Sequence, residues 1–374
     1  MINKNSKIYV AGHCGLVGSA IWNNLKARGY RNLVGRSHKE LDLTKESEVE
    51  TFFEKERPDV VVLAAAFVGG IMANSLYRAD FIMQNMKIQC NVISSAYKYK
   101  VKKLLFLGST CIYPKNAPQP MAEDALLTSP LEYTNEEYAI AKIAGLKMCE
   151  SYNLQYGTNY IAVMPTNLYG PNDNFHLENS HVMPAMMRKV YLSKLIHDVN
   201  WVAIENDMNK RPVEGVTGYN DRQEILSVLA KYGIHDNRVI LWGTGTPLRE
   251  FLWSEDMADA SVYILLNIDF KDIVKKEKYS SVFLGTSSAG AVNRNNSEGR
   301  GGAIPSLGEI RNCHINVGTG KELTIRELSE LVTKTVGFEG VVEFDTSKPD
   351  VAMRKLIDVS KLHSCLLYTS DAAD

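Results

Sequence analysis

The chain has 374 residues, of which 45% are hydrophobic and 23% charged, as in ordinary globular proteins of one large or two moderate domains. The formal net charge of −1 gives no overall attraction to nucleic acid or to a membrane surface, so neither is expected as a partner. Six scattered cysteines without a CxxC pair argue against a metal site and a disulfide framework. With no signal peptide and no apolar stretch of membrane-spanning length, we expect a cytoplasmic protein.

The first 165 residues alternate between strand-like and helical segments. Short apolar runs rich in β-branched and aromatic residues predict strands at 7–11, 32–35, 59–66, 103–108 and 160–165. Apolar residues at helical spacing predict helices at about 16–29, 46–56, 75–99 and 136–156. Fully apolar strands that alternate with helices are typical of a doubly wound parallel sheet, so we predict an α/β fold of the Rossmann type.

The pattern changes after Pro171. Apart from a helix near 182–195, residues 173–249 show no regular pattern, and 205–238 is polar. The low complexity of 287–309 indicates a loop or disorder, after which a strand and turn at 315–320 and a helix at 323–337 follow. We therefore predict a dinucleotide-binding domain at 1–172 to which 250–268 and 314–318 return, a smaller substrate domain at 173–249 and 319–374, and a low-complexity insertion at 270–310.

A glycine cluster follows the first predicted strand and opens the first predicted helix. Gly12, Gly15 and Gly18 have the GxxGxxG spacing of short-chain dehydrogenases. Glycine suits a tight turn that must approach a pyrophosphate closely, and the following helix N-terminus supplies N–H donors. The alternative is a purely structural glycine turn. The strand–turn–helix context favours a dinucleotide site.

Arg36 stands at the end of the second predicted strand. NAD-binding proteins place an acidic residue near here to hold the ribose 2′-hydroxyl, whereas a guanidinium suits the 2′-phosphate of NADP. The alternative is a solvated surface arginine. We predict NADP(H) as the cofactor.

Tyr138 and Lys142 lie four residues apart on a predicted helix, on the same face. A tyrosine with its ordinary pKa of ~10 is a poor proton carrier at neutral pH. A nearby ammonium is expected to lower that pKa into the working range. Ser109, at the end of the fourth predicted strand, is placed to hydrogen-bond the same substrate oxygen. Together these residues predict proton transfer at a carbonyl or carbinol carbon beside a nicotinamide.

Residue type alone leaves two interpretations each for Cys111 and His181. Cys111 lies two residues after Ser109, and either faces the same cavity or is a small apolar core residue. His181 precedes a predicted helix and is either catalytic or a satisfied structural group.

Many motifs in the same order resemble the GDP-L-fucose synthase family of extended short-chain dehydrogenases/reductases, which are GDP-4-keto-6-deoxy-D-mannose 3,5-epimerase/4-reductases. They are GHCGLVGSA, LAAAFVGGIMAN, FLGSTCIYP, YAIAKIAG, MPTNLYGPNDNFH, NSHVMPA, WGTGTPLREFL, INVGTG and SKPD. The similarity extends to about His363, with interruptions at 205–236 and 270–310.

The resemblance implies roles for individual residues. Ser109, Tyr138 and Lys142 match the reductase triad, and Cys111 and His181 match the pair credited with the epimerisations at sugar carbons 3 and 5. Cofactor contacts are implied for Gly12, Gly15, Leu16, Val17, Gly18, Arg36, Ala65, Lys142, Pro165, Asn167, Leu168 and His181. Contacts to the GDP-sugar are implied for Asn167, Arg188 or Lys189, Trp242, Arg249 and Lys348. A homodimer through the helices near 75–99 and 136–156 is also implied.

Three features depart from the family pattern. Val351 follows SKPD where glycine is usual, and the segments 205–236 and 270–310 are longer than in compact members. The last ten residues, CLLYTSDAAD, do not resemble the expected continuation, from which we expect lower stability than in longer relatives.

Two rival functions stay open. One is a related nucleotide-sugar 4-epimerase or 4,6-dehydratase, which would retain NAD(H). The other is a non-catalytic NADP-sensing module. Cys111 disfavours the dehydratase, which would have an acidic residue there, and the presence of both Tyr138 and Lys142 disfavours the sensor.

Overall fold

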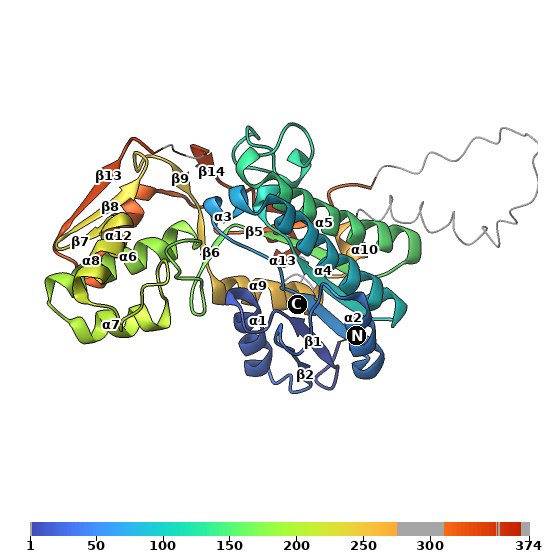
Figure 1. The fold of residues 1–374 in the computed structure, drawn as a ribbon. Coiled ribbons are helices and arrows are strands. Elements are labelled where there is room, and N and C mark those ends of the chain that lie inside the picture. The colour runs from blue at the N-terminus through green and yellow to red at the C-terminus, as the bar shows by residue number, and fades with distance from the viewer. Residues whose placement is uncertain (1, 275–309, 349, 351, 368–374) are drawn as a thin grey trace, which may run out of the picture.

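A computed structural model describes residues 2–274, 310–348, 350 and 352–367 (Figure 1). Most of the predicted insertion, including the low-complexity segment 287–309, lies outside the described residues, as do Val351 and the C-terminal residues 368–374. None of the helices in the described part has the length and apolarity needed to cross a bilayer.

A six-stranded parallel sheet forms the larger half of the molecule. Its strands are β1 (Ile8–Ala11), β2 (Leu33–Val34), β3 (Val60–Leu63), β4 (Lys103–Leu107), β5 (Tyr160–Pro165) and β11 (Ile315–Val317). They lie in the order β11-β5-β4-β3-β1-β2. All pairs are parallel, and the longer strands β1, β3, β4 and β5 are buried along their whole length. The predicted doubly wound α/β fold is confirmed.

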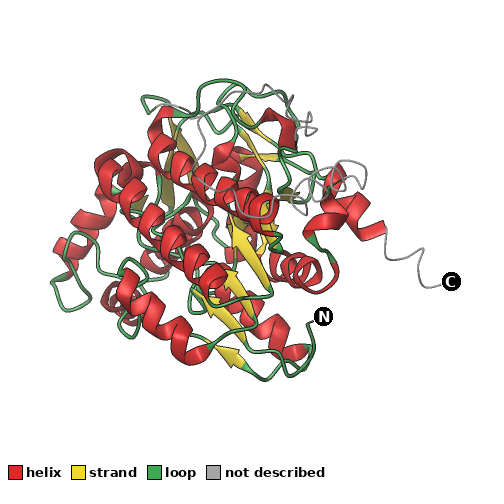
Figure 2. Ribbon diagram, turned by 90° about the vertical axis from the view of Figure 1, so that its right-hand side faces the viewer, coloured by secondary structure: helices red, strands yellow, loops and turns green. Residues whose placement is uncertain are grey.

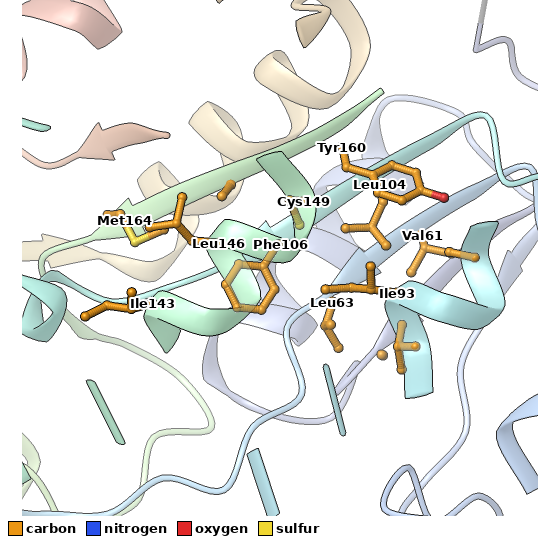
Figure 3. Packing of buried hydrophobic residues seen from close by; sticks show 14 of the residues in the cluster. Val61, Leu63, Ile93, Leu104, Phe106, Ile143, Leu146, Cys149, Tyr160 and Met164 are labelled. Atoms are coloured by element: carbon orange, nitrogen blue, oxygen red, sulfur yellow. The ribbon is translucent and has the colours of Figure 1, made fainter. Parts of the chain in front are cut away.

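Helices cover both faces of this sheet (Figure 2). One face is covered by α2 (Glu46–Glu56), α4 (Arg78–Lys98) and α5 (Glu136–Tyr156), and the other by α1 (Leu16–Ala27) and α9 (Ser254–Asn267). Figure 3 shows the first core, where Phe106 of β4 packs between Ile143 and Leu146 of α5 and Leu63 of β3. This packing fixes α5, the helix that carries Tyr138 and Lys142, against the ends of the central strands.

The strand order reverses between β1 and β3. From β1 the chain first adds β2 on one side and then continues with β3 on the other, so the loops that follow β1 and β3 diverge at this point. In doubly wound sheets ligands bind at the carboxyl ends of the strands beside such a reversal. The glycine loop and Ala65 lie there.

The smaller half consists of short sheets and helices, on the left of Figure 1. Its sheets are β12-β9-β14 and β13-β8-β7, and β10-β6 lies between the two halves. The strands are β6 (Asn167–Tyr169), β7 (Ile234–His235), β8 (Arg238–Trp242), β9 (Leu248–Arg249), β10 (Phe251–Trp253), β12 (Leu323–Thr324), β13 (Val341–Asp345) and β14 (Arg354–Lys355). The helices are α6 (Val182–His197), α7 (Trp201–Lys210), α8 (Arg222–Lys231) and α12 (Ile325–Val336).

The expectation that 205–238 lacks regular structure is wrong. It forms part of α7 and all of α8, which bury Ile204 and Met208, and Ile225 and Leu229, in a small core of their own. These residues are spaced four apart, the spacing of one helix face. The many polar residues between them obscured that pattern in the sequence.

Two further elements differ from expectation. The helix predicted at 75–99 is two helices, α3 (Ile71–Leu76) and α4, separated at Tyr77, whose backbone is not helical. In the returning segment 250–268, α9 packs on α1, but β10 pairs with β6 and does not join the six-stranded sheet. The remaining short helices are α10 (Phe270–Ile273) and α13 (Ser360–Leu367).

Candidate active site

The glycine loop has the geometry of a dinucleotide cradle. Gly12 has a φ of +85°, and a Cβ there would lie 2.8 Å from the backbone nitrogen of Ala65 in the loop after β3. A Cβ on Gly18 would lie 2.0 Å from the Gly12 carbonyl oxygen, so only glycine lets α1 start this close to the turn. Gly15 is the exposed N-cap of α1, and no side chain caps the helix there. Its N-terminal N–H groups, including those of Leu16 and Val17, therefore fit a pyrophosphate.

Arg36 lies just after β2, beside this loop. Its guanidinium forms a 2.7 Å ion pair with Glu56 at the end of α2 and donates to the carbonyl of Gly35 at 2.8 Å. These two contacts hold the planar group in place while its side chain stays one-third exposed. Arg36 is thus an oriented cation and not a freely solvated one.

Ser109, Tyr138 and Lys142 come together at the carboxyl end of β4. Ser109 follows β4 and caps a single 3₁₀ turn, where its Oγ accepts from the Cys111 amide at 3.3 Å. Lys142 is buried, donates from Nζ to the Leu107 carbonyl at 2.8 Å, and lies 5.7 Å from the centre of the Tyr138 ring. The Tyr138 ring also meets Phe81 of α4 edge-on.

The expectation that Lys142 lowers the pKa of Tyr138 is wrong for this structure. Burial raises the pKa of Tyr138, and a charge on Cys111 adds to the rise. Burial lowers the pKa of Lys142 to about 8. Desolvation penalises the charged form of both groups, and the Lys142 ammonium donates to Leu107. Tyr138 is consequently a protonated phenol at neutral pH, the form that donates a proton to a developing alkoxide.

Cys111 and His181 face the same part of the molecule from opposite halves. Cys111 is buried in the turn after β4, and burial raises its pKa, although Lys355, Ser109 and Lys142 act to lower it. His181 is the exposed N-cap of α6, and the chain just before it is fixed by the Gly70 amide, which donates to Asn179 O at 2.8 Å. Partial desolvation and the Lys355 cation lower the pKa of His181. The Cys111 thiol and the His181 imidazole are therefore both neutral at pH 7.

Lys355 is a site residue that the sequence reasoning missed. It lies on β14, and its charge acts on both Cys111 and His181, whereas burial lowers its own pKa. The backbone on its C-terminal side is fixed beside the loop after Cys111, because the Met121 amide donates to Leu356 O at 2.8 Å. The residues around Lys355 form no motif that predicts this position, because only the pairing of β14 with β9 brings Lys355 to the site.

Trp242, Lys348 and Arg249, which were predicted to contact the GDP-sugar, lie in the smaller half of the molecule. Trp242, at the end of β8, is 58% exposed, and Lys348 lies 5.6 Å from its ring centre. Asp350 accepts from the Thr244 amide and hydroxyl at 3.1 and 2.7 Å, which ties the loop of Lys348 to the loop after Trp242. Arg249 is half-buried on β9. A flat ring beside cations suits a base joined to a diphosphate.

The structure separates Arg188 from Lys189. Arg188 is buried, forms an ion pair with Asp207 of α7 at 2.8 Å and donates to Phe175 O at 3.1 Å. Lys189 is half-buried and has no ion-pair partner among the described residues, and burial lowers its pKa to about 8. Arg188 is therefore committed to holding α6 and α7 together, and Lys189 is the one left to meet a ligand.

The segment after β5 joins the two halves. Pro165 ends β5, and Asn167 and Leu168 form β6, which pairs with β10. The Asn167 amide donates to the carbonyl of Glu250 at 2.8 Å, so its side-chain oxygen is the part left for a ligand. These residues lie at the same sheet edge as Ser109.

Comparisons with known proteins agree with this geometry. The model of the NAD dependent epimerase/dehydratase family matches residues 8–213 and 213–279. GDP-L-fucose synthase 1 of Arabidopsis thaliana is 48% identical over 97% of this chain and 88% of its own length. GDP-L-fucose synthase of Escherichia coli is 46% identical over 97% and 91%.

A solved structure extends the likeness to three dimensions. The GDP-mannoheptose C4 reductase of Campylobacter jejuni with NADP bound is 40% identical, with a TM-score of 0.76 over 98% of this chain and 94% of its own. The glycine loop, the Ser109–Tyr138–Lys142 grouping and these matches lead to one assignment. The chain belongs to the NAD dependent epimerase/dehydratase family and, within it, to the GDP-L-fucose synthases.

Proposed function

We propose that this protein is an NADP(H)-dependent GDP-L-fucose synthase, which inverts carbons 3 and 5 of GDP-4-keto-6-deoxy-D-mannose and reduces the ketone at carbon 4. One observation carries the proposal: the Lys355 charge acts on both Cys111 and His181, two proton carriers, and Cys111 lies in the turn that Ser109 caps. The relatives named GDP-L-fucose synthase at 46–48% identity support it.

The epimerisation chemistry follows from the ketone. A carbonyl at carbon 4 acidifies the protons on carbons 3 and 5, because the carbanion is delocalised as an enolate. Ser109 and Tyr138 hydrogen-bond the oxygen on which that charge develops. Each inversion needs one group to remove a proton and another to return one from the opposite face. A neutral thiol with a neutral imidazole holds one transferable proton, which supplies one donor and one acceptor.

Reduction uses the same oxygen contacts. Bound NADPH supplies the hydride for carbon 4. Tyr138, kept protonated by burial, donates its proton to the forming alkoxide, and Lys142 holds the end of β4 through Leu107. Leu16, Val17 and Arg36 are proposed to receive the pyrophosphate and 2′-phosphate, with Ala65, Pro165 and Leu168 lining the cofactor channel.

The GDP part of the substrate is assigned to residues of the smaller half of the molecule. We assign Trp242 to the guanine ring and Arg249, Lys348 and Lys189 to the diphosphate. Their positive charges would attract a dianion locally, which the chain as a whole, with a net charge of −1, does not. Asn167 is assigned to the sugar.

A homodimer through α4 and α5 is part of the proposal. These two helices pack side by side and expose Met83, Ile140 and Tyr156 at 52%, 43% and 47%. Large apolar side chains on neighbouring helices favour burial in a four-helix contact with a second copy. We also propose the cytoplasm as its location, because all six cysteines are free thiols.

A second candidate function is reduction alone. Reduction at carbon 4 is the activity named for the heptose C4 reductase at 40% identity. Cys111 and His181 favour the full epimerase–reductase, because a simple reductase has no use for a second pair of proton carriers.

One experiment separates the two functions. The protein is incubated in D₂O with NADPH and GDP-4-keto-6-deoxy-mannose, NADPH absorbance is followed, and the sugar product is identified by NMR. GDP-L-fucose with deuterium at carbons 3 and 5 is the expected product. A reduced sugar without deuterium at those carbons would support the C4 reductase. No oxidation of NADPH would refute both.

A further inference from the structure

Glu250 is a buried charged residue that the proposed mechanism does not use. Its side chain is fully buried, and no cation among the described residues forms an ion pair with it. It follows directly after Arg249 and lies between β9 and β10. A buried carboxylate without a counter-ion is costly unless hydrogen bonds satisfy its oxygens, so its partners explain why it is there.

The two carboxylate oxygens of Glu250 bind backbone on both sides of β9. Oε1 accepts from the amides of Thr319 and Gly320 at 2.6 and 2.8 Å, and from the Thr319 hydroxyl at 3.2 Å. Oε2 accepts from the amide of Ile357 at 3.2 Å. A Cβ on Gly318 would lie 2.4 Å from Oε1, so the loop approaches this closely only with glycine there.

These contacts fix both strands that flank Arg249. Thr319 and Gly320 lead into β12, which pairs with β9 at Leu323↔Arg249. Ile357 follows β14, which pairs with β9 at Lys355↔Arg249. One carboxylate therefore holds the chain that enters β12 and the chain that leaves β14.

The consequence for the site is the placement of two like charges. Residues in register on neighbouring strands point to the same face, so Arg249 and Lys355 lie side by side and repel each other. Nothing in a two-residue strand pair is strong enough to enforce that arrangement. The Glu250 hydrogen bonds, on the opposite side of the strand, provide the missing restraint.

We infer that Glu250 is a positioning residue of the sugar-nucleotide site, which holds β12 and β14 against β9 so that Arg249 and Lys355 present adjacent cations to an anionic ligand. The inference rests on the proposed function, because the GDP diphosphate is the anion those cations receive. Glu250 itself touches no ligand.

The test compares Glu250→Gln with Glu322→Gln. Glu322 pairs with Arg354 at 2.7 Å at the same junction and, within the described chain, makes no contact to the partners of Glu250, so its variant is a matched loss of one carboxylate. The amide in Glu250→Gln keeps the shape of the side chain but replaces one acceptor oxygen by a donor. This variant should weaken GDP binding by about tenfold in calorimetry and leave NADPH affinity within about twofold. Glu322→Gln should change both by less than about twofold.

The outcomes distinguish the two proposals. If the unmodified protein binds no GDP, the proposed function fails. If it binds GDP and Glu250→Gln binds it equally well, the positioning role is refuted. Should Glu250→Gln not fold, hydrogen exchange of the unmodified protein decides. The amides of Thr319, Gly320 and Ile357 should then be as protected as those of β11, and rapid exchange would overturn the inference.

Discussion

Raising the pH from about 7 to about 9 should separate reduction from epimerisation. The pKa of Lys142 is lowered by burial to about 8, so about 90% of its side chains are charged at the lower pH and about 10% at the higher. Tyr138 becomes a phenolate when it donates its proton, and the Lys142 ammonium, 5.7 Å from the centre of its ring, stabilises that anion only while it is charged, so reduction should fall roughly ninefold. Because its pKa is lowered, Lys142 loses its proton at a lower pH than an ordinary lysine does. The rate of reduction should therefore decline around pH 8.

Epimerisation should persist across the same interval. The pKa of Cys111 is raised above the ordinary thiol value and that of His181 is lowered below the ordinary imidazole value. Between them the pair keeps its single transferable proton over this whole range. On the acid side, protonation of His181 removes the acceptor, so epimerisation should decline only below its ordinary value of 6.5.

Two assays measure the two steps independently. NADPH absorbance reports reduction, and deuterium uptake at carbons 3 and 5 with NADP⁺ in place of NADPH reports epimerisation alone. A parallel fall of both rates, or a flat reduction rate, would refute the reasoning. Lys142→Arg provides a control, because a guanidinium stays charged throughout: whatever its absolute rate, its alkaline limb near pH 8 should disappear.

Three further predictions concern single residues. Arg188→Met should lower the free energy of unfolding by about 1–3 kcal/mol in urea titration, because it removes a buried guanidinium and leaves Asp207 with Arg211 as its ion-pair partner. Lys189→Met should leave the unfolding midpoint unchanged but weaken GDP binding, and the reverse pattern would exchange their roles. Cys111→Ser should slow deuterium uptake at least about a hundredfold without altering NADPH affinity, since general acid–base groups contribute that much; unchanged uptake would exclude Cys111. Cys14, the one exposed cysteine of the six, should be alkylated about tenfold more slowly with NADPH at ten times its Kd, and undiminished labelling by mass spectrometry would place the cofactor elsewhere.

The features predicted correctly from sequence are local ones. The strand–glycine–helix unit at Gly12 and the four-residue spacing of Tyr138 and Lys142 depend on neighbours in the chain, so the sequence displays them directly. Gly12 also directly follows a buried strand whose apolar run is unambiguous. The sequence of α7 also contains a helical pattern, because Ile204 and Met208 are four residues apart, although polar residues are more numerous in this segment.

The features missed depend on packing between distant segments. Lys355 enters the site only because β14 pairs with β9, and two-residue strands leave no pattern in a sequence. Arg188 and Lys189 are adjacent and chemically alike, and only the position of Asp207 on α7 tells them apart. The pKa of Tyr138 moved opposite to expectation because its degree of desolvation is a property of the folded site.

The edge strand β11 has a consequence for synthesis of the protein. It is the last strand of the six-stranded sheet to be made, and it pairs with β5, which ends at Pro165. At the usual pace of translation the roughly 150 intervening residues take about 8 to 30 s to emerge. During that interval β5, apolar along its whole length, carries an unpaired edge, which is a template for association with other chains. The nascent polypeptide is thus more prone to aggregate than the finished enzyme, in which β11 covers this edge.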